Sequence, residues 1–201
     1  PPGSCSINDC LDKAAASIRW DEKHGRAAQQ TGRLRYGVGI AAGTHVSNAM
    51  PFCVDYGTVL LRIERDGTLF VNSAIPEIGP GSTTACLQVA CDLIGVPFED
   101  AVMKFGDTDA APFDIGSHAT RTLYTVSHVI ADAAETLRAD LFSWVGKKLG
   151  LEPASLDMQD GVISSAGKQV ATLFDMAAQA HLEGRQFIAS SSKIPPNCLP
   201  F

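Results

Sequence analysis

Two glycine-containing turns, each leading directly into a stretch with helical apolar spacing, constrain the fold of this 201-residue chain more than any other feature. The first turn contains Gly79, Pro80 and Gly81, and the second runs from Gly116 to Arg121. A turn that leads into a helix presents backbone N–H groups at the positive end of the helix dipole. If two such helix N-termini meet in space, they form a site for an anion such as a phosphate or a pyrophosphate.

The bulk composition is that of a folded, acidic protein. Hydrophobic residues make up 45% of the chain and charged residues 19%, which are values of globular domains and not of disordered chains. The net charge is −6 and no basic run occurs, which argues against nucleic-acid binding. No stretch approaches the roughly 20 apolar residues of a membrane helix. We therefore expect a cytoplasmic protein of one domain with appendages that binds neither nucleic acid nor membrane.

The N-terminus has neither the pattern of a signal peptide nor an initiator methionine, so we expect a fragment or a processed piece. No two cysteines form a C-x-x-C pair, and the histidines lack the spacing of a zinc site. We therefore expect no protein-bound metal and only reduced thiols. The six cysteines are Cys5, Cys10, Cys53, Cys86, Cys91 and Cys198.

Turn residues and apolar periodicity divide the chain into helices and strands. Asp66-Gly67 and Asp160-Gly161 each lie between apolar runs and predict two hairpins. Ser6 with Asp9, and Thr172 with Asp175, are capping-box patterns, and Ser82 is a candidate cap. The expected elements are a helix at 7–20, a strand at 36–43, strands at 57–64 and 68–72, a helix at 82–94, a strand at 101–105, a long helix from about 119, a hairpin at 156–163 and a helix at 172–184.

Strands and helices alternate irregularly, so we predict an α+β fold, a mixed sheet with hairpins and with helices packed on it. The expected domain spans residues 36–185. An N-terminal helix and polar linker at 1–35 precede it, and a truncated or irregular tail at 186–201 follows.

The chemistry-bearing residues near the two turns each allow two interpretations. A lone Gly-x-Gly before a helix is also typical of an ordinary tight turn. Arg121, placed unfavourably for the helix dipole, meets an anion or a ligand, or pairs with an acidic side chain on the surface. Glu77 is a candidate base or a structural carboxylate that accepts bonds from the turn. Asp107 and Asp109 are expected to cap a loop. His118 is a candidate catalyst or, as we expect, a packed or solvated histidine. No serine or cysteine nucleophile with a partner is evident.

The order of these motifs resembles the molybdenum-cofactor-binding part of the large subunit of the xanthine dehydrogenase/aldehyde oxidase family. The resemblance covers roughly residues 5–185. The residues that carry it are Asp66-Gly67, Gly79-Pro80-Gly81 with Thr84, Ile94-Gly95-Val96-Pro97, Asp107-Thr108, and Gly116 with Ala119-Thr120-Arg121, preceded by 9–20 and 36–41.

The resemblance implies a molybdopterin cofactor, or its cytosine dinucleotide form, held at these two turns. It implies cofactor binding by Gly79, Pro80, Gly81, Thr84, Gly116, Ala119, Thr120 and Arg121, with no metal ligand and no catalytic residue on this chain. It further implies partners: the remainder of the large subunit or a second molybdopterin subunit, and iron–sulfur and FAD-containing domains or subunits.

Two departures from the family pattern define the alternatives. Pro80 stands where the family has a glutamine that donates to the cofactor, and proline has no N–H. The family's catalytic Gly-Glu dipeptide is absent, so the chain alone is expected to catalyse nothing. We expect part of a molybdenum hydroxylase; the alternatives are a non-enzymatic α+β scaffold that has lost cofactor binding and an unrelated binder of phosphate ligands.

Overall fold

The computed structural model describes residues 5–27, 29–43, 45–46 and 54–195. Contacts between Cα atoms divide the chain into a smaller unit within residues 1–45 and a larger unit over residues 46–200. Each unit is described by itself below. Among the described residues, no helix is both long enough and apolar enough to cross a membrane.

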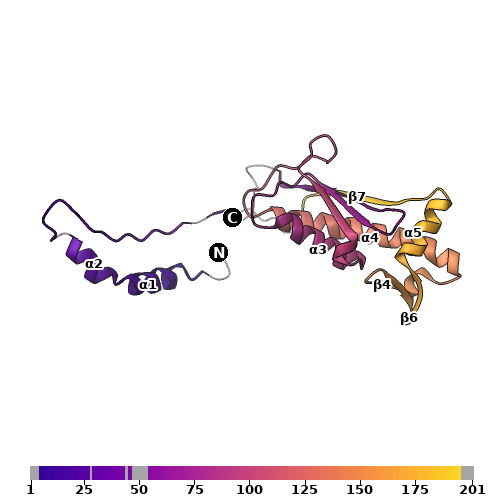
Figure 1. Ribbon diagram of the computed structural model, residues 1–201, viewed down its shortest axis with the longest axis horizontal. Helices are drawn as coiled ribbons and strands as arrows, with labels where there is room; N and C mark the ends of the chain where they lie inside the picture. The colour runs from indigo at the N-terminus through magenta and orange to yellow at the C-terminus, as the bar shows by residue number, and fades with distance from the viewer. Residues whose placement is uncertain (1–4, 28, 44, 47–53, 196–201) are drawn as a thin grey trace. The chain divides into compact units, whose positions relative to one another are not determined.

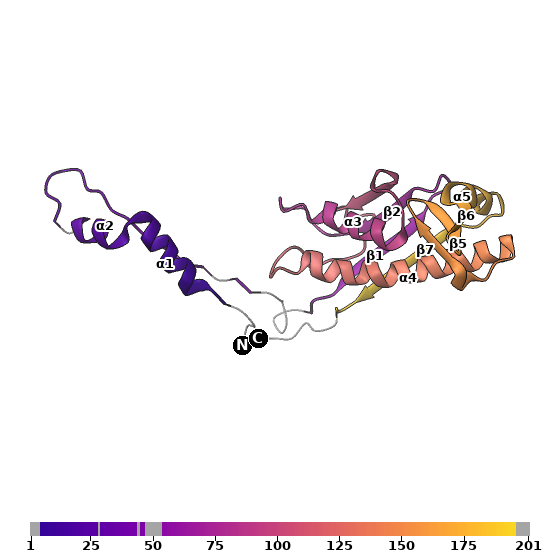
Figure 2. The same cartoon turned by 90° about the horizontal axis from the view of Figure 1, so that it is seen from below.

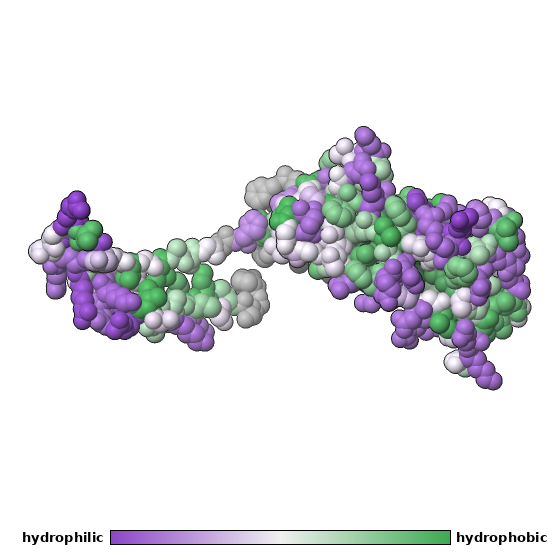
Figure 3. Space-filling model, viewed as in Figure 1, coloured by the Kyte–Doolittle hydropathy of each residue, from purple (hydrophilic) through white to green (hydrophobic). Residues whose placement is uncertain are grey.

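The smaller unit consists of two consecutive helices, α1 (Ile7–Ile18) and α2 (Trp20–Ala27), separated by Arg19 in the left-handed region at φ 54°. The linker expected from residue 21 is therefore wrong over 21–27, where Glu22 pairs with Arg26 at 2.8 Å and Trp20 stacks on His24. Ser6 precedes α1, but its side chain makes no capping bond. Neither helix buries a residue, and apolar side chains lie on the surface of this unit (Figure 3).

The strand expected at 36–43 does not form. These residues have no regular secondary structure, because the described part of this unit contains no strand that they can pair with. The Gln30 side chain substitutes locally for a neighbouring strand. It donates to the Tyr36 carbonyl oxygen at 2.5 Å and accepts from the Tyr36 N–H at 2.8 Å.

The larger unit is built on a four-stranded mixed sheet with the order β3-β2-β1-β7 (Figures 1 and 2). The hairpin at Asp66-Gly67 is confirmed, and β1 and β2 are antiparallel neighbours. The β2–β3 pair is parallel, which requires the crossover that α3 provides. The strands are β1 (Gly57–Ile63), β2 (Leu69–Ser73), β3 (Ala101–Phe105) and β7 (Phe187–Lys193).

Strand β7 corrects the expectation of an irregular tail at 186–201. It pairs along its whole length with β1, from Gly57 opposite Lys193 to Ile63 opposite Phe187. The strand alternates buried and exposed positions, and Ser191 occupies a buried one. A run of serines hid this alternation from the apolar pattern. Residues 196–201 lie outside the described residues.

Two helices cover one face of this sheet, α3 (Ser82–Ile94) and α4 (Thr122–Leu149). They bury alternate residues of the strands, such as Val59, Leu61 and Val71, which are fully shielded from solvent. The long helix begins three residues later than predicted, so Ala119 and Thr120 belong to the turn that precedes it. This placement keeps both residues outside the helical hydrogen-bond ladder.

A second, antiparallel sheet has the order β4-β5-β6 and lies beside the short helix α5. The predicted hairpin at Asp160-Gly161 and the Thr172 cap are confirmed; Thr172 Oγ1 accepts from the Asp175 N–H at 3.1 Å. Gly95, which follows α3, packs so closely on this sheet that a Cβ atom there would lie 2.1 Å from the Met158 carbonyl oxygen. These elements are β4 (Leu156–Gln159), β5 (Val162–Ser165), β6 (Lys168–Thr172) and α5 (Leu173–Leu182), and the short 3-10 turns are η1 (Phe98–Asp100) and η2 (Pro153–Ser155).

Candidate functional site

The first predicted turn leads into α3 and is open to solvent. Gly79 has φ 110° and Gly81 has φ 76°, which are conformations that L side chains rarely adopt. A Cβ atom at either glycine would meet no atom within 4 Å. The glycines are therefore required by the backbone conformation and not by lack of space. Pro80 lies between them and is exposed.

The carboxylate of Glu77 caps this turn from within the chain. Its Oε1 atom accepts from the backbone N–H groups of Gly79 at 2.7 Å and of Gly81 at 3.1 Å. Its Oε2 atom accepts from the Thr83 N–H and from the Thr83 hydroxyl, each at 3.1 Å. The bonds from Thr83 and Gly79 hold the pKa of Glu77 below its usual range. Of the two interpretations of Glu77, base or structural carboxylate, the structure therefore supports the structural one. Ser82, the candidate cap, makes no capping bond.

The second predicted turn contains two consecutive residues in the left-handed region, Ala119 at φ 49° and Thr120 at φ 59°. Neither is a glycine, so the backbone is strained here and the surroundings must hold it. Helix α4 begins directly afterwards, and the preceding residue, Arg121, provides no side-chain cap. Within the described chain, the N–H groups of Ala119 and Thr120 meet no hydrogen-bond acceptor.

Arg121 is the residue that holds the second turn. Its side chain is fully buried, and all five of its N–H donors are used. The Nε atom donates to Asp55 at 2.5 Å, and Nη1 donates to Asp114 and to the Gly116 carbonyl oxygen, each at 2.9 Å. The Nη2 atom donates to the Tyr56 carbonyl oxygen at 2.6 Å and to Asp114 at 3.3 Å. The guanidinium therefore has no N–H left for a ligand.

Of the two interpretations of Arg121, the structure shows pairing with acidic side chains, but in the interior and not on the surface. Sequence reasoning missed both partners, Asp55 and Asp114, which are 2% and 1% exposed. The sequence did contain a signal for a structural role of Asp114, because an aspartate two residues before a glycine favours an Asx turn. Its Oδ1 atom accepts from the Gly116 N–H at 2.8 Å.

The two turns meet in space, which is the condition that the sequence analysis set for an anion site. The Ser117 hydroxyl of the second turn donates to the Pro76 carbonyl oxygen at 3.3 Å, directly before Glu77. Ser117 also lies 2.7 Å from the Thr122 hydroxyl in the first turn of α4. Far from this contact, Arg138 of α4 donates to the Ile94 carbonyl oxygen at the end of α3. The two helices therefore run side by side in the same direction, with both N-termini at one end of the unit (Figure 2).

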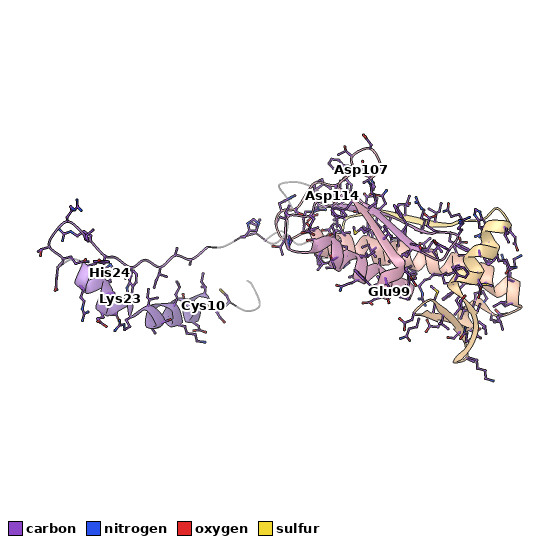
Figure 4. The ribbon with its side chains drawn as sticks, viewed as in Figure 1. Cys10, Lys23, His24, Glu99, Asp107 and Asp114 are labelled. Carbon is purple, nitrogen blue, oxygen red and sulfur yellow. The ribbon has the colours of Figure 1, made fainter. Side chains whose placement is uncertain are left out.

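The loop between β3 and α4 carries the remaining acidic candidates (Figure 4). Asp107 pairs with Lys104 at 3.0 Å and accepts from the Asp109 N–H at 3.1 Å. The bond from Lys104 is the main cause that lowers the pKa of Asp107. Asp107 therefore caps the loop, as expected. His118, the histidine beside the second turn, is exposed. Among the described residues, no three His, Cys, Asp or Glu side chains could together hold a metal ion.

Comparison with known proteins identifies the family. The sequence model of the molybdopterin cofactor-binding domain matches residues 13–197. The chain belongs to the molybdopterin cofactor-binding domain family. The xanthine dehydrogenase molybdenum-binding subunit of Escherichia coli O157:H7 is 31% identical over 196 residues, which cover 94% of this chain and 26% of that subunit. The aldehyde oxidoreductase molybdenum-binding subunit PaoC of Escherichia coli K12 is 26% identical over 181 residues, 90% of this chain and 23% of that subunit.

Solved structures confirm the fold of this molybdopterin-binding domain. The quinoline 2-oxidoreductase from Pseudomonas putida 86 has a TM-score of 0.65 at 18% identity, covering 94% of this chain and 26% of that chain. The CO dehydrogenase from Oligotropha carboxidovorans has a TM-score of 0.64 at 21% identity, covering 71% of this chain and 19% of that chain. The chain thus spans about a quarter of the length of the curated relatives it matches.

The described residues fit an anionic cofactor at the second turn better than at the first. Among the described residues, the N–H groups of Ala119, which is 3% exposed, and of exposed Thr120 have no acceptor, and they lie beside the N-terminus of α4, where the helix dipole favours a negative charge. At the first turn, Glu77 already accepts from Gly79, Gly81 and Thr83. The sequence carried a signal for this cap, a glutamate two residues before the first glycine.

Proposed function

We propose that this chain supplies part of the molybdopterin site of a molybdenum hydroxylase. The observation that carries the proposal is the pair of parallel helices, α3 and α4, whose N-termini meet through Ser117 and Pro76. The unbonded N–H groups of Ala119 and Thr120 lie at this meeting point and suit a phosphate or a pyrophosphate.

The sequence-predicted residues take distinct parts in the proposed site. Ala119 and Thr120 donate backbone N–H groups to the anionic part of the cofactor, and exposed Thr84 offers a hydroxyl from the first turn of α3. The other predicted cofactor-binding residues shape the two turns. The backbone path is set by Gly79, Pro80, Gly81 and Gly116, and Arg121 holds the second turn. No catalytic residue and no metal ligand is assigned to this chain.

The whole protein would then be a cytoplasmic oxidoreductase. Its molybdopterin, or the cytosine dinucleotide form, would supply the redox chemistry for hydroxylating an aldehyde or an N-heterocycle with oxygen from water. The rest of the large subunit, or a second molybdopterin subunit, would close the site. Iron–sulfur and FAD centres on other domains or subunits would accept the electrons. The relatives are about four times as long as the aligned segment, which leaves room for these parts.

A second function, a scaffold that has lost cofactor binding, is favoured by one observation. Pro80 has no N–H, and Glu77 occupies three other donors of the same turn. Under this alternative, the two helix N-termini remain for structural reasons only.

Cofactor content separates the two functions. The chain is produced as part of its whole large subunit in a host that makes molybdopterin, and bound pterin and molybdenum are measured by fluorescence after oxidation and by elemental analysis. We expect pterin in the wild-type chain and at least tenfold less in Thr120→Glu, which places a carboxylate beside the unbonded N–H groups. Thr136→Glu, a change at an exposed position within α4, is the control and keeps wild-type content. Absence of pterin from the wild-type large subunit supports the scaffold.

A further inference from the structure

Glu77 makes four hydrogen bonds with the turn that leads into α3. One carboxylate accepts from three backbone N–H groups and a hydroxyl, and all of these donors belong to the next six residues of the chain. Gly79 and Gly81 have no side chains, and nothing lies within 4 Å of where their Cβ atoms would be. Packing against Gly79 and Gly81 therefore does not hold this turn.

The N-terminus of α3 is also an electrostatic site that one charge can occupy. A carboxylate there interacts favourably with the helix dipole, as a bound phosphate does at other helices. Glu77 fills this position with its own negative charge. The contrast with α4 is direct, because the N-cap residue of α4, Arg121, turns its side chain toward Asp55 and Asp114 and offers no cap.

We propose that Glu77 is a positioning residue that fixes the glycine turn before the cofactor binds and excludes a ligand anion from the N-terminus of α3. The anionic part of the cofactor is thereby directed to the N-terminus of α4, while the first turn contributes shape and the Thr84 hydroxyl. This inference rests on the proposed cofactor site. It explains how the turn keeps its conformation although Pro80 contributes no N–H.

The first test measures amide hydrogen exchange by NMR in the 201-residue chain. Glu77→Gln retains the shape of the side chain, but its amide nitrogen cannot accept a bond. Its amide oxygen still accepts, so we expect exchange at least tenfold faster at the amides that lose their acceptor, either Gly79 and Gly81 or Thr83, with other amides unchanged. The control is Asp66→Asn, because Asp66 caps another turn by accepting from the Thr68 N–H at 3.1 Å. Unchanged exchange at the three amides in Glu77→Gln overturns the proposal.

The second test asks which helix N-terminus admits an anion, with inorganic phosphate as the probe. In the wild-type chain, phosphate is expected to leave the NMR shifts of Gly79, Gly81 and Thr83 unchanged. In Glu77→Ala, where the helix N-terminus is vacated, saturable shifts are expected at these amides. If Glu77 only stabilises the turn, removing it should create no new phosphate site. The proposal is therefore overturned if phosphate shifts these amides equally in both proteins, or in neither.

Pterin content distinguishes failure of this inference from failure of the proposed function. We expect Glu77→Gln to retain at least fivefold less pterin than wild type, while Asp66→Asn retains all of it. Equal pterin in Glu77→Gln and wild type overturns the inference and leaves the proposed function standing. Absence of pterin from the wild-type protein overturns the proposed function. The inference that Glu77 directs the cofactor anion to α4 then fails as well.

Discussion

The Arg121 guanidinium and the Asp55 carboxylate form a fully buried ion pair, 2.5 Å between Nε and Oδ1, that joins the start of α4 to the residues before β1. Asp114 binds the same guanidinium, with its Oδ1 atom 2.9 Å from Nη1. Removing one partner of a buried ion pair leaves an uncompensated charge in the interior, whereas an exposed pair contributes little.

We therefore expect Arg121→Met to lower the free energy of unfolding by about 3–5 kcal/mol. Urea denaturation measures the change. Arg185→Met is the control, because Arg185 pairs with Asp140 on the surface, where both side chains are 41% exposed, and its loss should cost less than about 1 kcal/mol. A loss below about 1 kcal/mol in Arg121→Met would show that the buried carboxylates find other partners.

Gly95 gives a second prediction about stability. Its φ is 90°, and an added Cβ atom would lie 2.1 Å from the Met158 carbonyl oxygen. Gly150 is a matched control, with φ 67° and nothing within 4 Å of an added Cβ. Gly150→Ala should lower the free energy of unfolding by about 1–2 kcal/mol, because alanine must adopt the left-handed backbone conformation. Gly95→Ala should cost about 1–3 kcal/mol more, because the backbone of β4 must move. Equal melting temperatures of the two variants would contradict this steric account.

The cysteines are expected to differ in reactivity with iodoacetamide. Burial raises the pKa of the Cys86 thiol to about 12, with smaller contributions from Asp114 and Glu77, and burial raises that of Cys91 to about 11. Both should stay unmodified at pH 8, because the thiolate is the reactive form. Cys5 and Cys10 are exposed and should react. Peptide mass spectrometry after alkylation checks this, and labelling of Cys86 in the native protein would contradict its burial.

Asp132 links α4 to β7 and gives a prediction about pH. Hydrogen bonds from Lys193 and then Ser191 lower its pKa. A carboxylate with a lowered pKa in the folded state adds stability above its unfolded pKa of about 3.9, and loses it as the pH falls through the lower folded value. Asp132→Asn should therefore reduce stability at pH 7 more than at pH 2. Chemical denaturation at both pH values measures the difference, and an equal loss at both would contradict the linkage.

Much of the framework follows from local sequence signals. Asp66-Gly67 and Asp160-Gly161 predicted both hairpins, since these dipeptides favour the positive φ of tight turns. The apolar spacing after the two glycine turns predicted α3 and α4. The meeting of their N-termini was a conditional expectation, and the contact between Ser117 and Pro76 confirms it.

The parts that could not be predicted depend on distant partners. The direction of the Arg121 side chain depends on Asp55, which lies 66 residues earlier in the chain. Strand β7 is recognisable only through its pairing with β1, because its serines show no apolar alternation. Residues 36–43 have the composition of a strand, but a strand requires a neighbour with which to pair.

The pairing of β1 with β7 also affects the order in which the protein can be made. The side chains of Thr58 and Ser192 lie 2.8 Å apart, although 134 positions separate them in the chain. During synthesis, β1 can pair with β2 as soon as the hairpin leaves the ribosome, but its other edge stays open until β7 follows. At the roughly 5–20 residues per second of translation, this wait lasts on the order of ten seconds. For that interval the nascent chain exposes an unpaired apolar strand, which is the kind of edge that chaperones protect from aggregation.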